Sequence, residues 1–422
     1  MTVGASGAVA TFAIAGLATV GVLFRPWRAP EYAFALAGAA MLVVARLLPA
    51  DAAVAAILKG MDVYLFLAGM MLLAEAARQE GLFDWTAVHA VRAARGSQSR
   101  LFLLVYAVGA VVTIFLSNDA TAVVLTPAVY AAARAAKVEP LPYLFVCAFV
   151  ANAASFVLPI SNPANLVLFG EHMPHLGDWA RTFALPSVAA IVATFLALRT
   201  TQARALALPL AQDCESVELS SAGRAVGICL LLTVGVLVFS SLRGWDLGAP
   251  TLACGLIVLA TTFASGRNPL ATLRHVSWGV LPLVAGLFVL VEGLAHVGAI
   301  GLIADMLRAA AAAPKQTAFL AGLAAALASN LANNLPVGLI AASTAQAASA
   351  SREIVAALLI GVDLGPNLSI SGSLATLLWR RAVRAAGMEP SRGAFFRFAL
   401  FATPLALVLS TLSLWLTLQV TG

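Results

Sequence analysis

Ser117-Asn118-Asp119-Ala120-Thr121 stands in the middle of an apolar stretch that runs from about residue 100 to 136. The first half of the chain has a second polar group, Ser161-Asn162-Pro163-Ala164-Asn165. The second half also has two: Ser329-Asn330-Leu331-Ala332-Asn333-Asn334-Leu335-Pro336, and Asp363-Leu364-Gly365-Pro366-Asn367 running on to Ser371-Gly372-Ser373. Such side chains are costly at membrane depth unless they face a cavity or a solute. Paired interruptions in two halves indicate a secondary transporter with a site near the bilayer midplane.

The composition indicates that the chain spans a membrane. It is 61% hydrophobic and 10% charged over 422 residues, which leaves too little charge to cover a soluble surface. Apolar segments of about 17–25 residues follow one another, each long enough to cross a bilayer. The sequence therefore predicts an all-α polytopic membrane protein. Its Lys and Arg lie in short clusters between apolar runs, a pattern that sets orientation, so no nucleic-acid partner is expected.

Enzymatic motifs are absent from the sequence. It has no HExxH, no DDxxD-type metal site and no GxxxxGK[ST], so we expect neither an enzyme nor an ATPase, and no cofactor or metal. No CxxC pair occurs among Cys147, Cys214, Cys229 and Cys254, which indicates neither a disulfide framework nor a zinc site. The histidines fall in expected loops or interfaces, so a histidine proton relay is not expected; they are His89, His172, His175, His275 and His296.

Apolar runs predict ten membrane spans. They cover about 8–24, 30–49, 61–79, a broken segment from 141, 179–199, 225–242, 248–265, 279–297, a broken helix at 354–385, and 397–419. An amphipathic stretch at 83–95 resembles an interfacial helix. The polar stretch 200–223 is expected to be a cytoplasmic linker between a first half, 1–199, and a second half, 224–422.

Basic residues predict the orientation. They cluster after the third span, after residue 133 and before the last span, as Arg78, Arg92, Arg95, Arg100, Arg134, Lys137, Arg380, Arg381, Arg384, Arg392 and Arg397. The positive-inside rule places these clusters in the cytoplasm. That placement requires 100–136 to re-enter as a hairpin with its tip near the midplane. A second hairpin at 315–350 then enters from outside, and both termini lie outside.

An internal repeat supports two opposed hairpins and two broken helices. Leu67-Ala68-Gly69 precedes Glu75 with the spacing at which Val284-Ala285-Gly286 precedes Glu292. Leu158-Pro159-Ile160-Ser161 likewise resembles Leu368-Ser369-Ile370-Ser371. Because the halves start from opposite sides of the membrane, the repeat is inverted, which suits alternating access.

The polar groups supply the candidate binding residues. Helix ends that converge there leave unpaired backbone groups, and side-chain amides and hydroxyls add to them. The candidates are Ser117, Asn118, Thr121, Ser161, Asn162, Asn165, Asn330, Asn333, Asn334, Asn367, Ser371 and Ser373. This set suits a small polyhydroxylated solute or a weakly held cation, and it lacks the arginine that an anion site normally uses. The alternative is that these residues only cap helix ends.

Two pairs of carboxylates are candidates for proton chemistry. Asp119 lies at a hairpin tip and Asp363 at a helix break, where removal from water favours the neutral acid, so both are expected to carry the coupled proton. The alternative for Asp119 is N-capping of the second hairpin arm. Glu75 and Glu292 lie near the ends of their spans, and an accessory or structural role is expected for them.

Several of these strings resemble the arsenite efflux permeases, the ArsB family within the ion transporter superfamily. Ser117-Asn118-Asp119-Ala120-Thr121 through Leu125-Thr126-Pro127 is similar to that family's hairpin motif. Gly361-Val362-Asp363-Leu364-Gly365-Pro366-Asn367 and Gly372-Ser373-Leu374-Ala375-Thr376-Leu377-Leu378-Trp379 resemble its specific strings, and Asn333-Asn334-Leu335-Pro336 its second tip. The likeness spans most of the chain and is strongest at the four polar groups.

The resemblance implies a bacterial inner-membrane exporter of arsenite and antimonite, driven by protons and sometimes attached to a soluble ATPase. It also implies the fold of dicarboxylate and citrate carriers, whose tips carry Ser-Asn-Thr and bind sodium with an anionic substrate. Here Asp119 replaces that Thr, and its charge would repel a dicarboxylate. A sodium/proton antiporter and a sodium-coupled carboxylate carrier on the same fold remain the alternatives.

Overall fold

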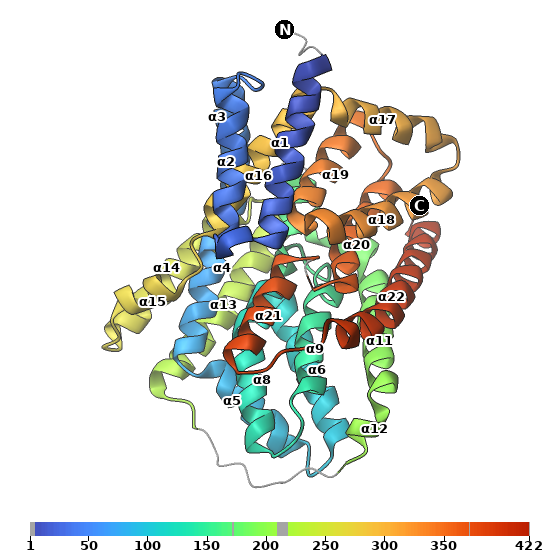
Figure 1. Ribbon diagram of the computed structural model, residues 1–422. Coiled ribbons are helices and arrows are strands. Elements are labelled where there is room, and N and C mark those ends of the chain that lie inside the picture. Colours follow the sequence, from blue (N-terminus) through green and yellow to red (C-terminus); the bar gives the residue numbers. More distant parts are fainter. Residues whose placement is uncertain (1–4, 171–172, 209–217, 371, 422) are drawn as a thin grey trace.

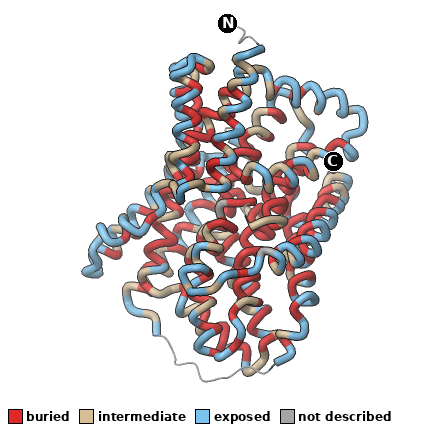
Figure 2. The backbone as a smooth tube through the Cα atoms, viewed as in Figure 1, coloured by how far each residue is buried: buried red, intermediate tan, exposed pale blue. Residues whose placement is uncertain are grey.

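The computed structural model describes residues 5–170, 173–208, 218–370 and 372–421. Every regular element in these ranges is a helix, and the helices surround a buried centre (Figures 1 and 2). Exposed apolar side chains such as Leu231, Leu302 and Phe401 cover the outside, as expected of a surface that faces lipid. The chain is therefore an all-helical polytopic membrane protein.

The first half begins with long helices and then becomes interrupted. Its elements are α1 (Ala5–Phe24), η1 (Pro26–Arg28), α2 (Glu31–Val44), α3 (Ala50–Lys59), α4 (Met61–Gln79), α5 (Leu82–Ala93), α6 (Gln98–Leu116), α7 (Asn118–Ala120), the π-helical turn η2 (Thr121–Leu125), α8 (Thr126–Ala135), α9 (Leu141–Ala153), η3 (Pro159–Ser161), α10 (Pro163–Phe169), α11 (Leu176–Thr201) and α12 (Ala203–Leu206).

The second half follows the same order of long and interrupted helices. Its elements are α13 (Ser221–Arg243), α14 (Gly248–Ala264), α15 (Pro269–His275), α16 (Val280–His296), α17 (Ala299–Ala309), η5 (Ala310–Ala312), α18 (Pro314–Ala332), α19 (Asn334–Ala348), α20 (Arg352–Leu364), η6 (Gly365–Leu368), α21 (Leu374–Ala385) and α22 (Arg392–Thr421). The expected linker is shorter than 200–223 among the described residues, because α11 and α12 extend to Leu206 and α13 begins at Ser221.

Membrane spans differ in detail from the ten that the apolar runs predict. Five described helices are long and apolar enough to cross a bilayer: α1, α6, α11, α13 and α22. Two bent pairs, α3 with α4 (47°) and α15 with α16 (41°), raise the number to seven if each pair is one span. The expected span at 30–49 is a helix of only 14 residues, since the chain turns after Val44 and α3 begins at Ala50.

Close helix packing connects the two halves. A Cβ on Gly69 of α4 would lie 2.4 Å from the Thr251 carbonyl of α14. A Cβ on Gly286 of α16 would lie 2.8 Å from the Ala35 carbonyl carbon of α2. Each of these glycines therefore lets its helix approach a helix of the other half, a use of small residues typical of membrane helix pairs.

The turns at Ser117 and Asn333, between pairs of apolar helices, have the same local form. Ser117 ends α6 with φ 111°, and its hydroxyl accepts a hydrogen bond from the Ala120 N–H. Asn333 ends α18 with φ 75°, and its side chain accepts one from the Leu335 N–H. In each case a non-glycine residue in the left-handed half of the φ range turns the chain, and its side chain caps the next helix.

Candidate functional site

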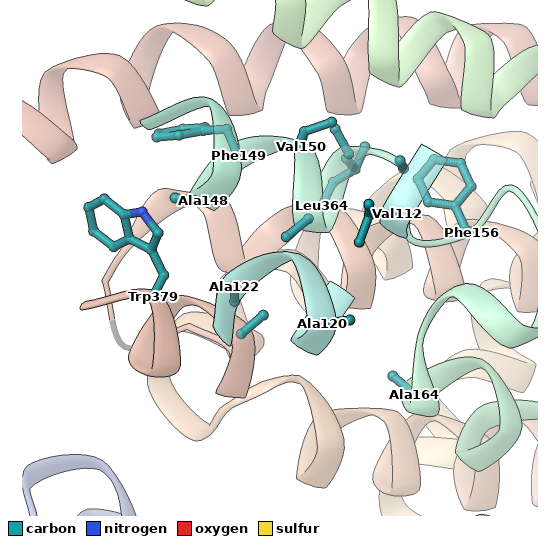
Figure 3. Packing of buried hydrophobic residues seen from close by; sticks show 14 of the residues in the cluster. Val112, Ala120, Ala122, Ala148, Phe149, Val150, Phe156, Ala164, Leu364 and Trp379 are labelled. Atoms are coloured by element: carbon teal, nitrogen blue, oxygen red, sulfur yellow. The ribbon is translucent and has the colours of Figure 1, made fainter. Parts of the chain in front are cut away.

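The first interruption folds back on the helix before it. The hydroxyls of Thr113 and Thr121 lie 2.8 Å apart and form a hydrogen bond, and Thr121 also donates to the Gly109 carbonyl at 3.4 Å. Thr121 is fully buried, so its hydroxyl joins the two arms of the hairpin. Small side chains such as Ala120 and Ala122 let this turn pack into the centre of the molecule (Figure 3).

A cavity of about 60 Å³ opens beside this hairpin tip. Its titratable lining groups are Asp119 from the tip, Glu75 from α4 and His275 from the end of α15, and Ser117 and Pro163 also reach it. One water needs about 10–15 Å³ on this measure, so the cavity has room for several waters or one small solute. Among the described lining residues there is no Arg or Lys.

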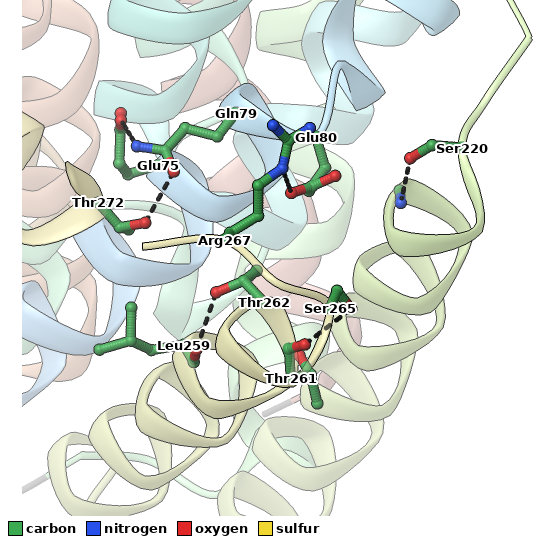
Figure 4. Close-up of polar contacts among 11 residues, drawn as sticks. Glu75, Gln79, Glu80, Ser220, Leu259, Thr261, Thr262, Ser265, Arg267 and Thr272 are labelled. Atoms are coloured by element: carbon green, nitrogen blue, oxygen red, sulfur yellow. Dashed lines mark hydrogen bonds and ion pairs between the residues drawn. The ribbon is translucent and has the colours of Figure 1, made fainter. Parts of the chain in front are cut away.

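Glu75 is fixed beside the cavity by an ion pair. Arg78 donates from Nε at 2.8 Å and from Nη2 at 2.6 Å to its two carboxylate oxygens. Gln79 donates to Glu75 Oε1 at 2.7 Å, and Thr272 donates to Gln79 Oε1 at 2.7 Å (Figure 4). These hydrogen bonds tie α4 to α15 at the edge of the cavity.

The other candidate glutamate lies away from the cavity. Glu292 forms an ion pair with Lys59 at 3.4 Å, in which the Lys59 side chain is 63% exposed. An exposed pair of this kind contributes little to stability, between about 0 and 1 kcal/mol. The two glutamates of the internal repeat therefore have different surroundings.

Asp363 has a different environment from Asp119. It is fully buried near the end of α20, and both carboxylate oxygens accept hydrogen bonds. Ser155 donates to Oδ2 at 2.6 Å and Asn162 donates to Oδ1 at 2.9 Å. Asp119, by contrast, is half-buried, and among the described residues no hydrogen-bond donor reaches its carboxylate.

The same buried network continues between the two helix breaks. Asn152 donates to Asn367 Oδ1 at 2.9 Å, and Asn367 donates to the Phe149 carbonyl at 3.1 Å. Asn165 donates to the Ser155 carbonyl at 2.8 Å. Ser161 donates to the Ile114 carbonyl at 2.9 Å and so ties the first break to the first hairpin.

The second hairpin meets the second break. Asn330 donates at 2.8 Å to the Gly365 carbonyl, and Asn334 is buried just beyond the cap at Asn333. Ser373 caps α21 by accepting from the Thr376 N–H at 3.1 Å. Ser371, a further candidate, lies outside the described residues. The first break, the second break and the second hairpin therefore form one polar region, and the first hairpin reaches it through Ser161.

Five asparagines of the hairpins and breaks have a buried side-chain oxygen without a hydrogen-bond partner among the described residues. They are Asn118, Asn152, Asn165, Asn330 and Asn334. A buried unpaired acceptor costs about 1–3 kcal/mol, so such a group gains from a donor supplied by a ligand. The region therefore offers acceptors to a solute that carries hydrogen-bond donors.

Three residues of the site were not predicted from the sequence. Asn152 and Ser155 were overlooked because they lie inside or just after an apolar helix, and their partners are more than 200 residues away in the sequence. His275 was expected in a loop or interface, and the structure places it at the end of α15, where it lines the cavity with Asp119 and Glu75. A polar residue at the end of an otherwise apolar run was the available signal for Asn152 and Ser155.

An all-helical membrane chain whose helices break around one buried polar region defines the class of secondary transporters. The chain belongs to the CitMHS family, described as citrate transporter, whose model matches residues 20–361. It is a transporter and not an enzyme.

Curated relatives cover most of the chain. The arsenical pump membrane protein of Escherichia coli strain K12 is 30% identical over 370 residues, which is 81% of this chain and 83% of that protein. The arsenical pump membrane protein of Yersinia enterocolitica is 30% identical over 364 residues with the same coverage. The YdaH transporter of Alcanivorax borkumensis is similar in fold, with a TM-score of 0.60 at 16% identity over 87% of this chain and 88% of that chain.

Proposed function

We propose that the chain exports trivalent arsenite and antimonite across the bacterial inner membrane in exchange for protons. The observation that carries the proposal is the set of five buried asparagine oxygens to which no described residue donates a hydrogen bond. Arsenite in water is an uncharged trihydroxy acid, and its hydroxyl groups can donate to such oxygens. The arsenical pump membrane proteins among the relatives support the same cargo.

Cysteine is not needed for this mode of recognition. Cys147 is buried in α9, and Cys229 and Cys254 lie on α13 and α14, so none of the three described cysteines lines the cavity. Thiolates bind trivalent arsenic tightly, whereas an exporter must also release it. Recognition by hydrogen bonds gives the faster release.

Asp119 is the proposed carrier of the coupled proton, because its carboxylate reaches the cavity. Asp363 is proposed to respond to the same event from inside the buried network, where its oxygens bind Ser155 and Asn162. Substrate contacts are assigned to the remaining polar residues of the two hairpins and two breaks.

The proposed mechanism is alternating access between two inverted repeats, 1–199 and 224–422, each with a re-entrant hairpin and a broken helix. Matching close approaches at Gly69 and Gly286 support this, as do the matching turns at Ser117 and Asn333. The N-terminus and α12 lie at opposite ends of the molecule (Figure 1), which supports an outside N-terminus and a cytoplasmic linker. An ATPase partner would then dock near that linker.

A sodium-coupled carboxylate carrier is the second candidate, favoured by the citrate description of the family model. The cavity argues against it, since its described lining has the carboxylates of Asp119 and Glu75 and no Arg or Lys. The third candidate, a sodium/proton antiporter, would transport neither a metalloid nor citrate, so transport assays distinguish it from the other two.

The test is uptake of radiolabelled arsenite by everted membrane vesicles under an imposed proton gradient. We expect uptake with the wild-type chain and a fall of about ten-fold or more with Asp119→Asn, because the variant cannot exchange a proton at the cavity. Sodium-dependent alkalinisation without arsenite uptake, or citrate uptake, would contradict the proposal. Equal uptake by Asp119→Asn and wild type would exclude Asp119 as the proton carrier.

A further inference from the structure

His275 connects the cavity with the surface of the molecule. It is the last residue of α15, it is exposed, and it lines the same cavity as Asp119 and Glu75. Helix α15 lies at the edge of the molecule (Figure 1) and directly follows the polar residues Arg267 and Asn268. The His275 side chain therefore lies between the cavity and the outer surface of the molecule.

One hydrogen bond defines which nitrogen of His275 can exchange protons. The ring Nδ1 lies 2.7 Å from the Ala271 carbonyl, which can only accept, so Nδ1 carries hydrogen. In the neutral ring, Nε2 is then free to accept a proton, and in the charged ring it is free to donate one. Histidine is also the side chain whose charge ordinarily changes between pH 5 and 8.

Two carboxylates line the same cavity as His275. Asp119 comes from the first hairpin tip, and Glu75 comes from the neighbouring helix α4. The remaining charges near α15 are already paired or directed away: Arg78 with Glu75, Arg267 with Glu80 at 3.1 Å (Figure 4), and Arg274 exposed on α15 itself. Because Arg78 offsets the charge of Glu75, Asp119 is the carboxylate of the cavity lining without an ion-pair partner among the described residues.

We propose that His275 is the group through which protons enter or leave the cavity on their way to or from Asp119. This rests on the proposed proton exchange at Asp119. In the inward step, Nε2 takes a proton from solvent, the Nε2–H bond then breaks, and an O–H bond forms on the Asp119 carboxylate through the water that the cavity can hold. The imidazole is left neutral, with its hydrogen on Nδ1, and the pair has gained the one proton that was taken from solvent.

His89 provides a matched control for a transport test. It is also exposed on a short helix, α5, and its Nδ1 lies 2.8 Å from the carbonyl four residues earlier, Trp85, but it does not line the cavity. Proton-driven arsenite uptake is measured from pH 5.5 to 8.5 for wild type, His275→Gln and His89→Gln. We expect His275→Gln to slow uptake by about ten-fold and to change the shape of the pH profile, while His89→Gln matches wild type.

A lower rate with an unchanged pH profile would show that His275 has only a structural role, and a wild-type rate and profile would show that it has none. Arsenite exchange between equal concentrations at one pH, which needs no net proton movement, serves as a second measurement. We expect His275→Gln to retain it. Loss of exchange together with uptake would overturn the proposal.

A measurement without arsenite tests the role of His275 independently of the proposed substrate. The protonated fraction of His275 at pH 7 is read from the ¹⁵N shifts of the imidazole, assigned by the signal lost in His275→Gln. We expect Asp119→Asn to lower this fraction by about two-fold and to leave that of His89 unchanged, because a nearby carboxylate favours the imidazolium. If that holds while wild type transports no arsenite, the substrate is wrong and the proton route stands. If His275 does not respond, the proton route is wrong whatever the cargo.

Discussion

Asp119 lies at the first hairpin tip and Asp363 at the second helix break, and the two carboxylates have opposite surroundings. Asp119 is half-buried beside a cavity, without a hydrogen-bond donor among the described residues. Asp363 is fully buried, and Ser155 and Asn162 donate to both of its oxygens. A group that must exchange with solvent fits the first environment, and a group that holds two helix breaks together fits the second.

This contrast predicts different stabilities for two matched variants. Asp363→Asn replaces an acceptor oxygen by an NH₂ group that faces the Asn162 or Ser155 donor, so we expect a loss of about 1–3 kcal/mol in unfolding free energy. Asp119→Asn removes no hydrogen bond among the described residues and should unfold at the wild-type temperature. Thermal unfolding in detergent is the measurement, and equal midpoints for both variants would contradict the assignment.

The protein should transport arsenite without any of its cysteines. Replacing Cys147 by Ala and the other three cysteines by Ser should leave proton-driven arsenite uptake within about two-fold of wild type, since the proposed site binds by hydrogen bonds. Uptake is measured in everted vesicles, after gel filtration shows a single folded species. A folded cysteine-free protein that no longer transports arsenite would show that thiols bind the cargo.

Among the elements, the helix breaks depend on glycines as well as on polar residues. A Cβ on Gly361 of α20 would lie 2.1 Å from the Gly322 carbonyl oxygen of α18. A Cβ on Gly365 would lie 2.3 Å from the Ala326 Cα of α18. The second hairpin and the second broken helix can therefore meet only without side chains at these two positions.

We expect Gly361→Ala to destabilise the protein by about 1–3 kcal/mol, because the backbone that it meets cannot move aside easily. Gly16→Ala is the control, since no heavy atom lies within 4 Å of its Cβ position in α1. The control should be neutral, or up to about 1 kcal/mol more stable, because alanine favours a helix. Unfolding midpoints in the same detergent compare the two, and equal losses would show that close packing is not the cause.

Sequence reasoning located these elements well but not their ends. Helices α6 to α8 cover nearly the range 100–136, and α18 with α19 cover nearly 315–350, because Ser117 and Asn333 interrupt long apolar runs. That these segments re-enter the membrane stays a prediction. The separate helix α3 was not predicted, since its residues are as apolar as a span and only the turn after Val44 separates them. Partners such as Ser155 with Asp363 depend on tertiary contacts, which no local pattern reports.

At the scale of the molecule, the site is made by contacts between halves. Asp363 binds Ser155 and Asn162, and Asn367 binds Asn152, so the second break is held by the first. Trp379 of α21, fully buried, donates to the Leu144 carbonyl of α9 at 2.7 Å. A change in one half is therefore transmitted directly to the other, as alternating access requires.

Alternating access predicts a change in the exposure of the first hairpin tip. In the cysteine-free chain, Ser117→Cys should react with a small membrane-impermeant thiol reagent, because Ser117 lines the cavity. Saturating arsenite should slow the reaction, since the bound solute and the closed state both exclude the reagent. Gly16→Cys on the lipid-facing side is the control. Identical rates at Ser117→Cys with and without arsenite would argue against a gated site.

The crossed packing of α4 on α14 and of α16 on α2 has a consequence for biosynthesis. When the ribosome has made the first half, the glycine face of α4 at Gly69 has no partner, because Thr251 has yet to be translated. Ala35 of α2 likewise has no packing partner until Gly286 has been translated. The half-made protein therefore keeps two open packing faces in the lipid until Thr251 and Gly286 have been made, and chains truncated before residue 248 should be the ones that membrane proteases remove first.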